Sequence, residues 1–498
     1  MISGRGVFFA AILCAPFASP GVSPGTPASW IPARWEGGPL EVARRAQAGS
    51  LPPGPAAREA IENWYDPETL RLLDGSPINC LLVTWSAGGA AGIEQRQRQL
   101  VRAYAAEAHK RGVAVLGLVY PGAGARQAPE EAETAGLDGL ALDGDFAAYA
   151  GSLPAIRIWR DTASASAAKG PVVAIRGTSP GARNLADMGI RAAPSSEPWI
   201  ESNIWLVRFL RAGSPARAVW IDQQPEGSSP EDYTRSVADA AVAGGRWIVA
   251  LDDGIRAGLR RNDPAALAVW RRIGTAVGFA ERHAEWRAFQ PYGNLGIVVD
   301  PAVDEEEYLK LAARRQAPYR LIPRAELRDD SLRAFRAVLA AGLTPLSAAE
   351  RDFLKVFAQR GGVVIAGPSW GNPPKEESYA EFPTGKGRIV VYADPDPESV
   401  ARDLKDLLSQ EEMGVVAFNV PSVITYAAAE PGGRLLVQLL NYSNTPAQAI
   451  TIRVHGAFRT ARLYMPGAEP SDLPLKAEAG RIDVSIPKLP FWGAVLLE

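Results

Sequence analysis

The stretch INCLLVTWSAGGAAGIEQRQRQLVRAYAAEAHKRGVAVLGLVY, residues 78–120, decides the fold of this chain. Two apolar runs, 78–85 and 113–120, enclose a segment whose apolar residues have helical spacing and which ends at Gly112. A strand, a helix and a second strand in this order form a βαβ unit, whose two strands lie parallel in one sheet. The stretch therefore predicts a parallel sheet covered by helices.

The same alternation extends over residues 29–290 and supplies eight candidate strands. They are 29–35, 78–85, 113–120, 137–143, 155–159, 171–176, 216–222 and 246–252. Eight parallel strands close a barrel, and a (β/α)8 TIM barrel of roughly 250 residues fits the spacing and the length. A long helix expected over about 264–288 is placed to complete the outer ring. The fifth candidate strand is short, and a loop remains the alternative there.

A second alternation begins in the region 291–412. The runs NLGIVVD, YRLIP, AVLAAGL, VVIAG and GRIVVYA alternate with helical segments. Ser347 and Glu350 have the spacing of a capping box, which fixes the start of one of these helices. The pattern is typical of a flavodoxin-like doubly wound domain. The first strand is followed by DPAVDEEE and not by a Gly-rich phosphate loop, so we expect no nucleotide there.

The last region, 413–498, consists of short apolar runs separated by turn residues. VVAFNV, LLVQLLNY, AITIRVHG, TARLYMPG, RIDVSIP and GAVLLE have the spacing of a small β-sandwich. Because the region holds few candidate catalytic groups, we interpret it as a structural or partner-binding domain.

Composition and charge exclude several classes of protein. The chain has 498 residues with 47% apolar and 22% charged residues, which is the composition of a globular protein of several domains. Lys and Arg number 53 against 55 Asp and Glu, and no stretch concentrates the basic residues. We therefore do not expect a nucleic-acid partner.

The N-terminus predicts export. Arg5 precedes an apolar stretch from about residue 7 to 17, followed by small residues, Pro and Gly, so residues 1–28 are predicted to be a signal peptide and the protein to be secreted or periplasmic. A lipoprotein anchored through Cys14 is the alternative, which the bulky Leu13 disfavours. No other segment has the roughly 18 apolar residues that span a bilayer. After cleavage only Cys80 remains, which excludes an internal disulfide, and we expect it in the core.

TIM barrels carry their chemistry at the C-terminal ends of the strands. The carboxylates expected at these ends are Glu36, Asp143, Asp145, Asp161, Asp222, Asp252 and Asp253, and the aromatic and planar polar groups are Trp35, Trp85, Tyr120, Trp159, Trp220 and Arg176. Flat aromatic faces suit sugar rings, and carboxylates with Arg suit hydroxyl groups. We therefore expect an oligosaccharide or glycoside as substrate. The predicted catalytic residues are Asp143, Asp222 and Asp252, and the predicted substrate contacts are Trp35, Glu36, Trp85, Tyr120, Arg176 and Asp253.

Each of these residues also has a purely structural interpretation. A strand-end Asp is often the N-cap of the next helix, and Asp145 and Asp161 are the most easily explained in this way. Trp159, Trp220 and Trp247 fit core positions better than a sugar platform.

Metal and cofactor sites have no support in the sequence. His109, His283 and His455 fall on a surface helix, on the helix that closes the barrel and in the last region. These positions disfavour a His-ligated metal and a Ser-His relay. We predict no metal, flavin or nucleotide.

The order of these parts resembles a known family. A barrel, then LGIVVD, LIPRAEL and VLAAGLTPLSAAERDFLKVFAQRGGVVIAG, then LLVQLLNYSN and FWGAVLLE, is similar to glycoside hydrolases of the β-galactosidase type with a trimerisation domain. The resemblance implies a glycosidase that forms a trimer through its middle domain. The family ends its fourth and seventh barrel strands with a Glu pair, whereas this chain has Asp143 and Asp222 there.

Two hypotheses follow. In the first, the protein is an exported glycoside hydrolase, in which the resemblance implies Asp143 as acid and Asp222 as nucleophile or base, with Asp252 as substitute for Asp222. Because Asp is shorter than Glu, we expect a wide gap between the two carboxyl groups, which admits water and favours inversion. Phe146 is expected to raise the pKa of the acid. In the second, the barrel has lost catalysis and binds a glycan or serves in assembly.

Overall fold

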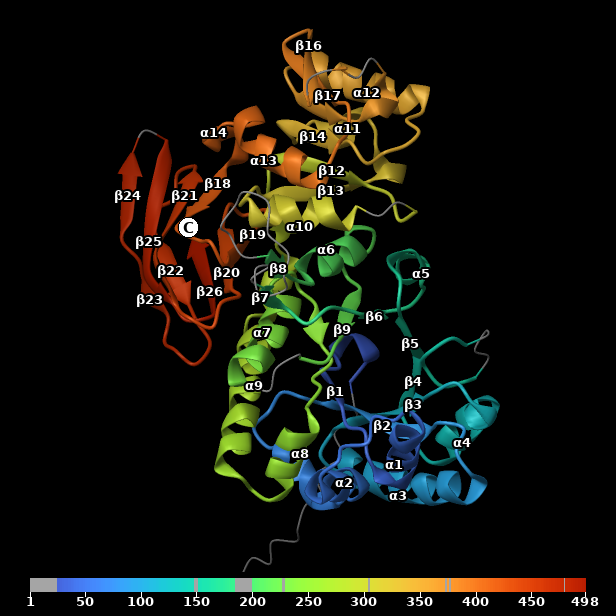
Figure 1. The fold of residues 1–498 in the computed structure, drawn as a ribbon. Coiled ribbons are helices and arrows are strands. Elements are labelled where there is room, and N and C mark those ends of the chain that lie inside the picture. Colours follow the sequence, from blue (N-terminus) through green and yellow to red (C-terminus); the bar gives the residue numbers. More distant parts are fainter. Residues whose placement is uncertain are drawn as a thin grey trace, which may run out of the picture.

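The computed structural model describes residues 25–146, 151–183, 199–225, 229–302, 305–371, 374–375, 378–478 and 480–498, with the side chains of 123–124 excepted. Most of the predicted signal peptide and the lipoprotein Cys14 lie outside these residues. The described chain forms a helix-covered barrel at one end, an α/β part at the other end, and a β-rich part that lies beside both (Figure 1).

The first sheet contains eight strands in the order β1-β2-β3-β4-β5-β6-β9-β10, and every neighbouring pair is parallel. The sheet closes on itself, because the Arg34 amide donates to the Val249 carbonyl at 2.8 Å and the Val249 amide donates to the Pro32 carbonyl at 3.0 Å. The strands are Pro32–Arg34, Cys80–Ser86, Ala114–Val119, Gly139–Asp143, Ala155–Trp159, Val172–Arg176, Ala218–Asp222 and Arg246–Trp247. All eight predicted strands are present, the short fifth one included, and the predicted TIM barrel is confirmed.

The outer ring is uneven. Its helices are α1 (Gly38–Gln47), α2 (Pro55–Glu62), α3 (Ala91–His109), α4 (Ala128–Thr134), α5 (Thr162–Ala167), α6 (Ile204–Ala212), α7 (Pro230–Ala241), α8 (Asp253–Arg260) and α9 (Pro264–Arg282). The described residues between β4 and β5 form no helix. Between β6 and β9 the chain also forms a two-stranded sheet of β7 (Gly181–Arg183) and β8 (Trp199–Glu201).

The barrel interior is a small apolar core of alternate strand residues. Cys80 and Leu82 of β2, Ala141 of β4 and Trp220 of β9 belong to it, which confirms the core position expected for Cys80. Because side chains alternate along a strand, the residue two positions beyond each core residue points inward as well. This rule places the strand-end polar residues at the mouth of the barrel.

The middle sheet has the order β13-β12-β14-β15-β17-β16, with β16 as the antiparallel edge strand. Apart from that edge this is the flavodoxin-like order predicted from the alternation. Its strands are Leu295–Val299 (β12), Tyr319–Pro323 (β13), Ala337–Ala340 (β14), Val363–Ala366 (β15), Tyr379–Thr384 (β16) and Gly387–Tyr392 (β17). Its helices are α10 (Glu306–Arg314), α11 (Asp329–Leu332), α12 (Ala348–Gln359), α13 (Pro397–Leu407) and α14 (Gln410–Met413). The capping box of Ser347 and Glu350 opens α12 as predicted.

The last part packs two antiparallel sheets around an apolar core, as a β-sandwich does. One sheet has the order β11-β19-β20-β26-β22-β23 and the other β18-β21-β25-β24. The strands are Gln290–Pro291 (β11), Val415–Phe418 (β18), Val423–Ala429 (β19), Leu435–Asn441 (β20), Ala447–His455 (β21), Ala461–Tyr464 (β22), Ser471–Asp472 (β23), Leu475–Glu478 (β24), Arg481–Leu489 (β25) and Trp492–Leu497 (β26). Strand β11 lies at the predicted end of the barrel domain and pairs with β19, so the sandwich takes one edge strand from the segment that leaves the barrel. The domain boundaries themselves remain predictions.

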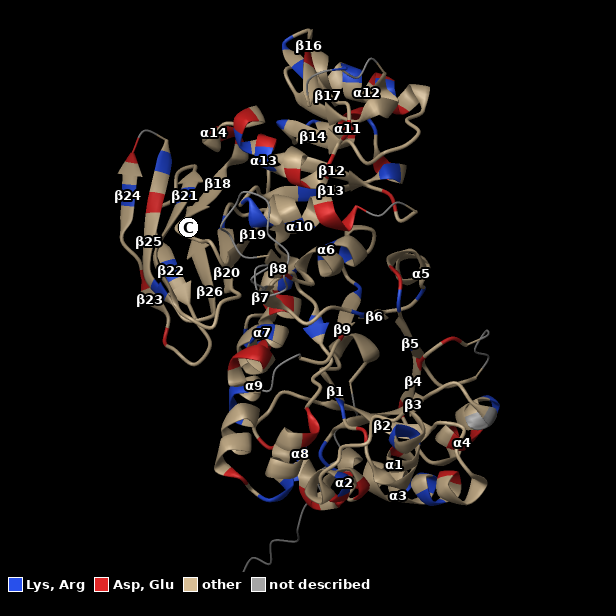
Figure 2. Ribbon diagram, viewed as in Figure 1, with Lys and Arg blue, Asp and Glu red and all other residues tan. Residues whose placement is uncertain are grey.

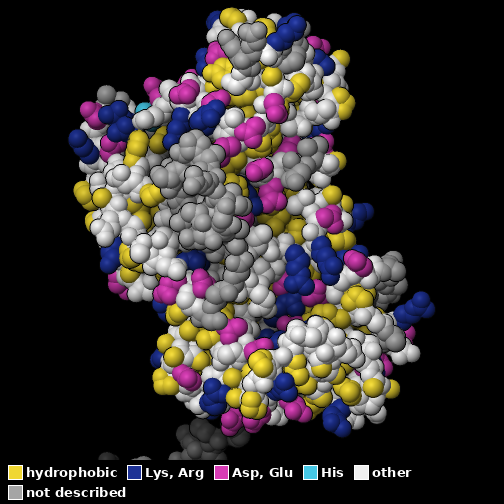
Figure 3. Space-filling view, viewed as in Figure 1, with side chains coloured by type: hydrophobic (Ala, Val, Ile, Leu, Met, Phe, Trp, Pro, Cys, Tyr) yellow, Lys and Arg dark blue, Asp and Glu magenta, His cyan; other side chains and the backbone are white. Residues whose placement is uncertain are grey.

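Charges are mixed over the molecule. Lys, Arg, Asp and Glu alternate along the elements of all three parts (Figure 2). On the face drawn in Figure 3, the described Lys and Arg side chains lie among Asp and Glu side chains. Among the described residues, no helix has the length and apolarity needed to cross a membrane.

Candidate functional site

A cavity of about 770 Å³ opens at the C-terminal ends of the barrel strands. Its polar lining comes from the ends of β1, β3, β4, β5, β6 and β9, from helix α1 and the residue Ser50 that follows it, and from the start of α8. The residues are Arg34, Glu36, Arg44, Arg45, Ser50, Tyr120, Asp143, Asp145, Arg160, Arg176, Gln224, Asp252 and Asp253. The structure therefore brings six of the nine predicted site residues to one cavity, which are Glu36, Tyr120, Asp143, Arg176, Asp252 and Asp253.

At the floor of this cavity four side chains form a closed ring of ion pairs, which we call the arginine clamp: Arg34, Arg176, Asp143 and Asp222. Arg34 Nη2 lies 2.7 Å from Asp143 Oδ2, and Arg34 Nε lies 2.6 Å from Asp222 Oδ1. Arg176 Nη2 lies 2.6 Å from Asp143 Oδ1, and Arg176 Nη1 lies 2.8 Å from Asp222 Oδ2. Each Arg thus binds both Asp residues.

The strand period explains why the clamp forms. Asp143 follows the interior residue Ala141 by two positions, and Asp222 follows Trp220 in the same way. Arg34 and Asp222 are 5% and 1% exposed as side chains, whereas the Arg176 side chain is 41% exposed. Arg176 is therefore the one member of the clamp that reaches far into the cavity.

Glu36 is the centre of a second network beside the clamp. Its Oε1 lies 3.2 Å from Arg34 Nη1 and 3.7 Å from Arg44 Nη2, and it accepts a hydrogen bond from the Tyr120 hydroxyl. The Arg44 guanidinium stands 4.2 Å from the centre of the Tyr120 ring. Arg256 donates to the Glu36 carbonyl at 2.5 Å. Arg34 joins the two networks, because it binds Glu36 as well as both Asp residues of the clamp.

These contacts fix the ionisation of the floor. Burial acts to raise the pKa of Asp143, but Arg34 and Arg176 outweigh it, and the pKa is lowered. Burial also acts to raise the pKa of Glu36, and Arg34, Arg256 and Arg44 lower it to about 2. Both carboxylates are therefore anions at neutral pH. The prediction that Phe146 raises the pKa of Asp143 is wrong, because two guanidinium groups contact this carboxylate directly.

The predicted wide gap between Asp143 and Asp222 is also wrong. Asp143 Oδ2 lies 2.7 Å from Arg34 Nη2, and Asp222 Oδ2 lies 2.8 Å from the same nitrogen. Because both oxygens bind the same nitrogen, the distance between them cannot exceed the sum of these two hydrogen-bond lengths. That limit is close to the roughly 5–5.5 Å of retaining pairs and below the roughly 6.5–9.5 Å of inverting pairs.

Asp252 and Asp253 line the cavity, but each has a structural partner. Asp252 caps α8 by accepting from the Ile255 amide at 2.9 Å, and it accepts from the Tyr233 hydroxyl. Asp253 Oδ1 lies 2.8 Å from Arg45 Nη1. Asp161 is the N-cap of α5, as its structural interpretation predicts. The helix-like run after Asp145 falls on residues outside those described.

Trp35 and Trp85 are not at the cavity, so their prediction as sugar contacts is wrong. Trp35 is 1% exposed, donates to the Tyr104 hydroxyl at 2.6 Å and packs against Trp64 at 4.9 Å between ring centres. Trp85 is fully buried and donates to the Ala128 carbonyl at 3.0 Å. Both side chains point outward from the strands into the layer between sheet and helices, because each lies one position from an inward-facing residue.

Sequence reasoning identified Arg176 but missed three other arginines of the site, which are Arg34, Arg44 and Arg45. Arg34 binds three carboxylates, and Arg44 and Arg45 stand on the cavity wall, where the buried Glu41 holds both at 2.6 Å. The signal for Arg34 was present, since it lies two positions before Glu36 and ends the first strand. The two side chains therefore had to share one face of the strand.

The described residues contain no group of three His, Cys, Asp or Glu side chains placed to hold a metal ion. The three His residues lie where the sequence predicted, at the end of α3, at the end of α9 and at the end of β21. None of them lines the cavity.

No protein-family model matches the chain, and no curated protein matches it. Among solved structures, the chain is similar to α-L-fucosidase isoenzyme 2 from Paenibacillus thiaminolyticus, with a TM-score of 0.59 and 11% identity over 87% of this chain and 96% of that one. A GH42 β-galactosidase from G. stearothermophilus matches with a TM-score of 0.38 and 10% identity over 82% of this chain and 67% of that one. A β-galactosidase from the psychrophilic Marinomonas ef1 matches with a TM-score of 0.38 and 10% identity, over 81% of this chain and 67% of that one. The likeness to the fucosidase shows that the two chains share a fold.

Proposed function

We propose that the protein is an exported glycoside hydrolase that cleaves a glycan in the barrel cavity. The observation that carries this proposal is Asp143, an ionised carboxylate at the C-terminal end of a barrel strand that lines the cavity. A fold shared with a structure named as an α-L-fucosidase supports the same class of substrate.

In this proposal Asp143 is the attacking carboxylate or the base, and not the acid that the resemblance implied. Its ionised state suits attack on the anomeric carbon or the activation of water. Asp222 is a positioning residue, because it is 1% exposed and holds Arg34 and Arg176 against Asp143. The Arg176 side chain is 41% exposed and lines the cavity, so it is placed to bind a sugar hydroxyl or a departing oxygen.

The proton donor is sought among the carboxylates of the cavity that have no arginine partner. Glu36, Asp143 and Asp253 are ion-paired. Asp145 and Asp252 line the cavity without an ion pair among the described residues. A glycosidic oxygen bound between Asp143 and either of these carboxyl groups would receive the proton while the bond to carbon breaks.

A panel of aryl glycosides tests the proposal. The wild type should release the aryl alcohol from at least one of them, and Asp143→Asn should lower turnover by at least about two orders of magnitude, the scale of general acid–base or nucleophilic help. Asp145→Asn and Asp252→Asn identify the acid. The variant that lacks the acid should lose less turnover on a substrate with an activated aryl leaving group than on one with a natural sugar leaving group, because the aryl group needs less protonation to depart. Asp74→Asn, on the surface, is the matched control.

A second candidate function is a barrel that binds glycan without cleaving it. The arginine clamp favours it, because Asp143 and Asp222 are each already ion-paired with two guanidinium groups. If no aryl glycoside is cleaved and a glycan array still gives saturable binding that Arg176→Gln removes, this second function replaces the first.

Export and assembly belong to the same proposal. The mature chain should begin between residues 18 and 30 and carry no disulfide, which mass spectrometry of protein from the native host tests. An intact Met1 there contradicts export. Light scattering of the purified protein tests the trimer that the resemblance implies.

A further inference from the structure

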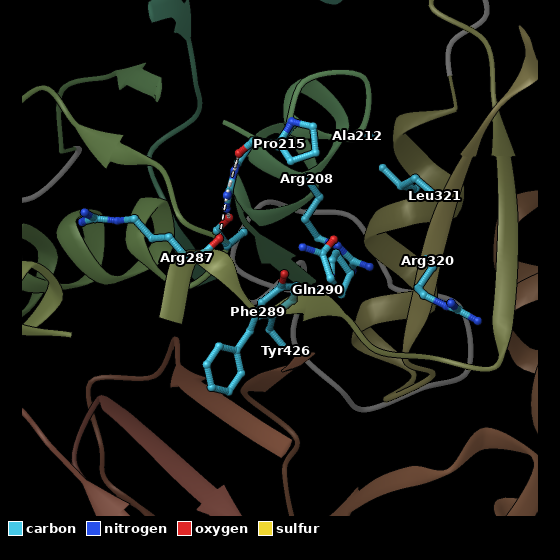
Figure 4. Close-up of a pocket in the computed structure, with 12 residues that line it drawn as sticks. Arg208, Ala212, Pro215, Arg287, Phe289, Gln290, Arg320, Leu321 and Tyr426 are labelled. Atoms are coloured by element: carbon cyan, nitrogen blue, oxygen red, sulfur yellow. Dashed lines mark hydrogen bonds between the residues drawn. The ribbon is translucent and has the colours of Figure 1, made fainter. Parts of the chain in front are cut away.

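A second cavity, of about 370 Å³, lies where the barrel, the middle part and the sandwich meet (Figure 4). We call it the junction pocket. It is lined by α6, by the segment 287–291, by β13 and by β19. The lining residues are Arg208, Arg211, Ala212, Pro215, Ala243, Arg287, Phe289, Gln290, Pro291, Arg320, Leu321 and Tyr426. Four of these described residues are Arg and none of them is Asp or Glu, so the described lining is cationic.

Arg208 projects from α6 to the middle of the junction pocket, beside Gln290 and Tyr426 (Figure 4). One face of its guanidinium stacks on the Tyr319 ring at 3.6 Å, and Nη2 donates to the Tyr319 carbonyl. The Nε atom is buried and has no hydrogen-bond partner among the described residues. The aromatic stack therefore fixes this cation at the wall of the pocket.

Arg211 is a second cation of the wall, and no carboxylate of the described residues is paired with it. Among these residues its guanidinium donates only to carbonyls, of Ala243 at 2.7 Å, of Arg287 at 2.9 Å and of Pro215 at 3.0 Å. Burial lowers the pKa of Arg211, which is the expected effect on a cation in a low-dielectric place without a counter-ion.

The other two arginines, Arg287 and Arg320, do not direct their charges into the cavity. The guanidinium groups of Arg287 and Arg320 point away from its centre in opposite directions (Figure 4). Arg287 is paired with Glu281 at 2.6 Å. Arg320 donates to the Gly293 carbonyl at 2.8 Å. The positive charge that faces the cavity therefore comes from Arg208 and Arg211.

The rest of the wall is apolar or flat. Phe289 and Tyr426 are 6% and 7% exposed, and Leu321, Pro291 and Ala212 complete the apolar side. A cavity of this size lies at the lower end of the roughly 300–1,000 Å³ range of small-molecule sites. Guanidinium groups select carboxylates through charge-assisted hydrogen bonds, and the apolar wall selects a ring.

We propose that the junction pocket binds a small carboxylate that carries a ring. The carboxylate accepts from Arg208 and lies in the field of Arg211, and the ring packs against Leu321 and Tyr426. The inference does not depend on catalysis in the barrel cavity, because the two cavities share no lining residue.

Calorimetric titration of the full chain with benzoate tests the proposal, with benzamide as the uncharged ligand of the same shape. Benzoate should bind saturably with a Kd of about 1 mM or tighter, and benzamide at least about tenfold more weakly. Arg208→Gln should weaken benzoate binding by at least about tenfold. Arg102→Gln, an exposed position on α3, is the matched control and should leave the Kd unchanged.

Three results would overturn the proposal. They are equal binding of benzoate and benzamide, no saturation up to about 20 mM, and an unchanged Kd in Arg208→Gln. Arg176→Gln distinguishes the two cavities, since loss of binding in this variant alone would place the ligand in the barrel cavity. If Arg208→Gln does not fold, Leu321→Trp fills the pocket from its apolar side and must abolish benzoate binding.

Discussion

The barrel cavity and the junction pocket are both lined by arginines, but their arginines have opposite kinds of partner. In the barrel cavity Arg34 binds three carboxylates, of Glu36, Asp143 and Asp222. In the junction pocket the hydrogen bonds that Arg208 and Arg211 donate to described residues all go to backbone carbonyls. Arginines alone therefore do not define a site, because the charges around them decide what the site can bind.

The difference has a direct electrostatic consequence. At the barrel floor the arginines lower the pKa of Glu36 and Asp143, so the anions are stabilised and held in place. At the junction, burial lowers the pKa of Arg211, and Tyr426, which acts to raise it, does not outweigh this effect. The first site is preorganised by its own charges, whereas the second one gains most from an added anion.

Replacing Arg34 by Met should give the largest effect. The change leaves Glu36, Asp143 and Asp222 without their shared cation in a place where they are 5% exposed or less. Removing one partner of a buried ion pair costs about 3–5 kcal/mol. Urea denaturation measures the loss of the free energy of unfolding. Arg34→Lys should lose less, because it keeps the charge, and equal stability of Arg34→Met and wild type would contradict the clamp.

Low pH should reduce the stability that the ion pairs at the barrel floor provide. The pKa of Glu36 is lowered from its ordinary 4.5 to about 2. The ionised Glu36 therefore contributes about 3 kcal/mol to the free energy of unfolding. This contribution is complete above about pH 4.5 and is lost as the pH falls towards 2. Asp143 has a lowered pKa and adds to the loss in the same direction. Glu36→Gln should flatten the dependence of unfolding free energy on pH in this window, and an unchanged slope would contradict the assignment.

Most of the fold could be predicted from the sequence, because each barrel strand is an apolar run followed by a turn. Even the short strand Ala155–Trp159 was found, although its pattern fitted a loop as well. Strands β19 and β16 were missed, as were the short strands β7, β8, β11, β23 and β24. ITYAAA in β19 is rich in Ala, and β16 is an exposed edge with Glu and Pro, so neither has a distinct apolar period.

The positions of the site residues were predictable, but their ionisation and some of their directions were not. The strand ends placed Asp143, Asp222 and Glu36 together, because parallel strands finish on one side of a barrel. The pKa of Asp143 depends on Arg34 and Arg176, which are 109 and 33 residues away along the chain. Trp35 was misassigned because a strand-end aromatic residue faces either the mouth or the helices, and only the register decides which.

Asp143→Asn tests the reaction proposed for the barrel cavity. The substitution keeps the size of the side chain and removes the anion that the proposed reaction uses. Turnover of the best aryl glycoside should fall by at least about a hundredfold. Thermal stability should fall as well, because Arg34 and Arg176 each lose a carboxylate partner. Asp222→Asn should also lower turnover, and because it acts through Arg34 and Arg176 it should shift the acidic limb of the pH profile of kcat/KM. Full activity in Asp143→Asn would contradict its role.

Arg208→Met should give the smallest effect and completes the contrast with Arg34→Met. The Met side chain keeps apolar contact with the rings of Tyr319 and Tyr426, over which the Arg208 guanidinium lies at 3.6 and 5.3 Å. The change loses a hydrogen bond to a carbonyl, but it also removes a buried Nε that has no partner. These two effects oppose each other, so the free energy of unfolding should change by about 1 kcal/mol or less. Urea denaturation without added anion measures it beside Arg34→Met. A loss as large as that of Arg34→Met would mean that Arg208 is a structural cation with partners of its own, and the contrast between the two cavities would then fail.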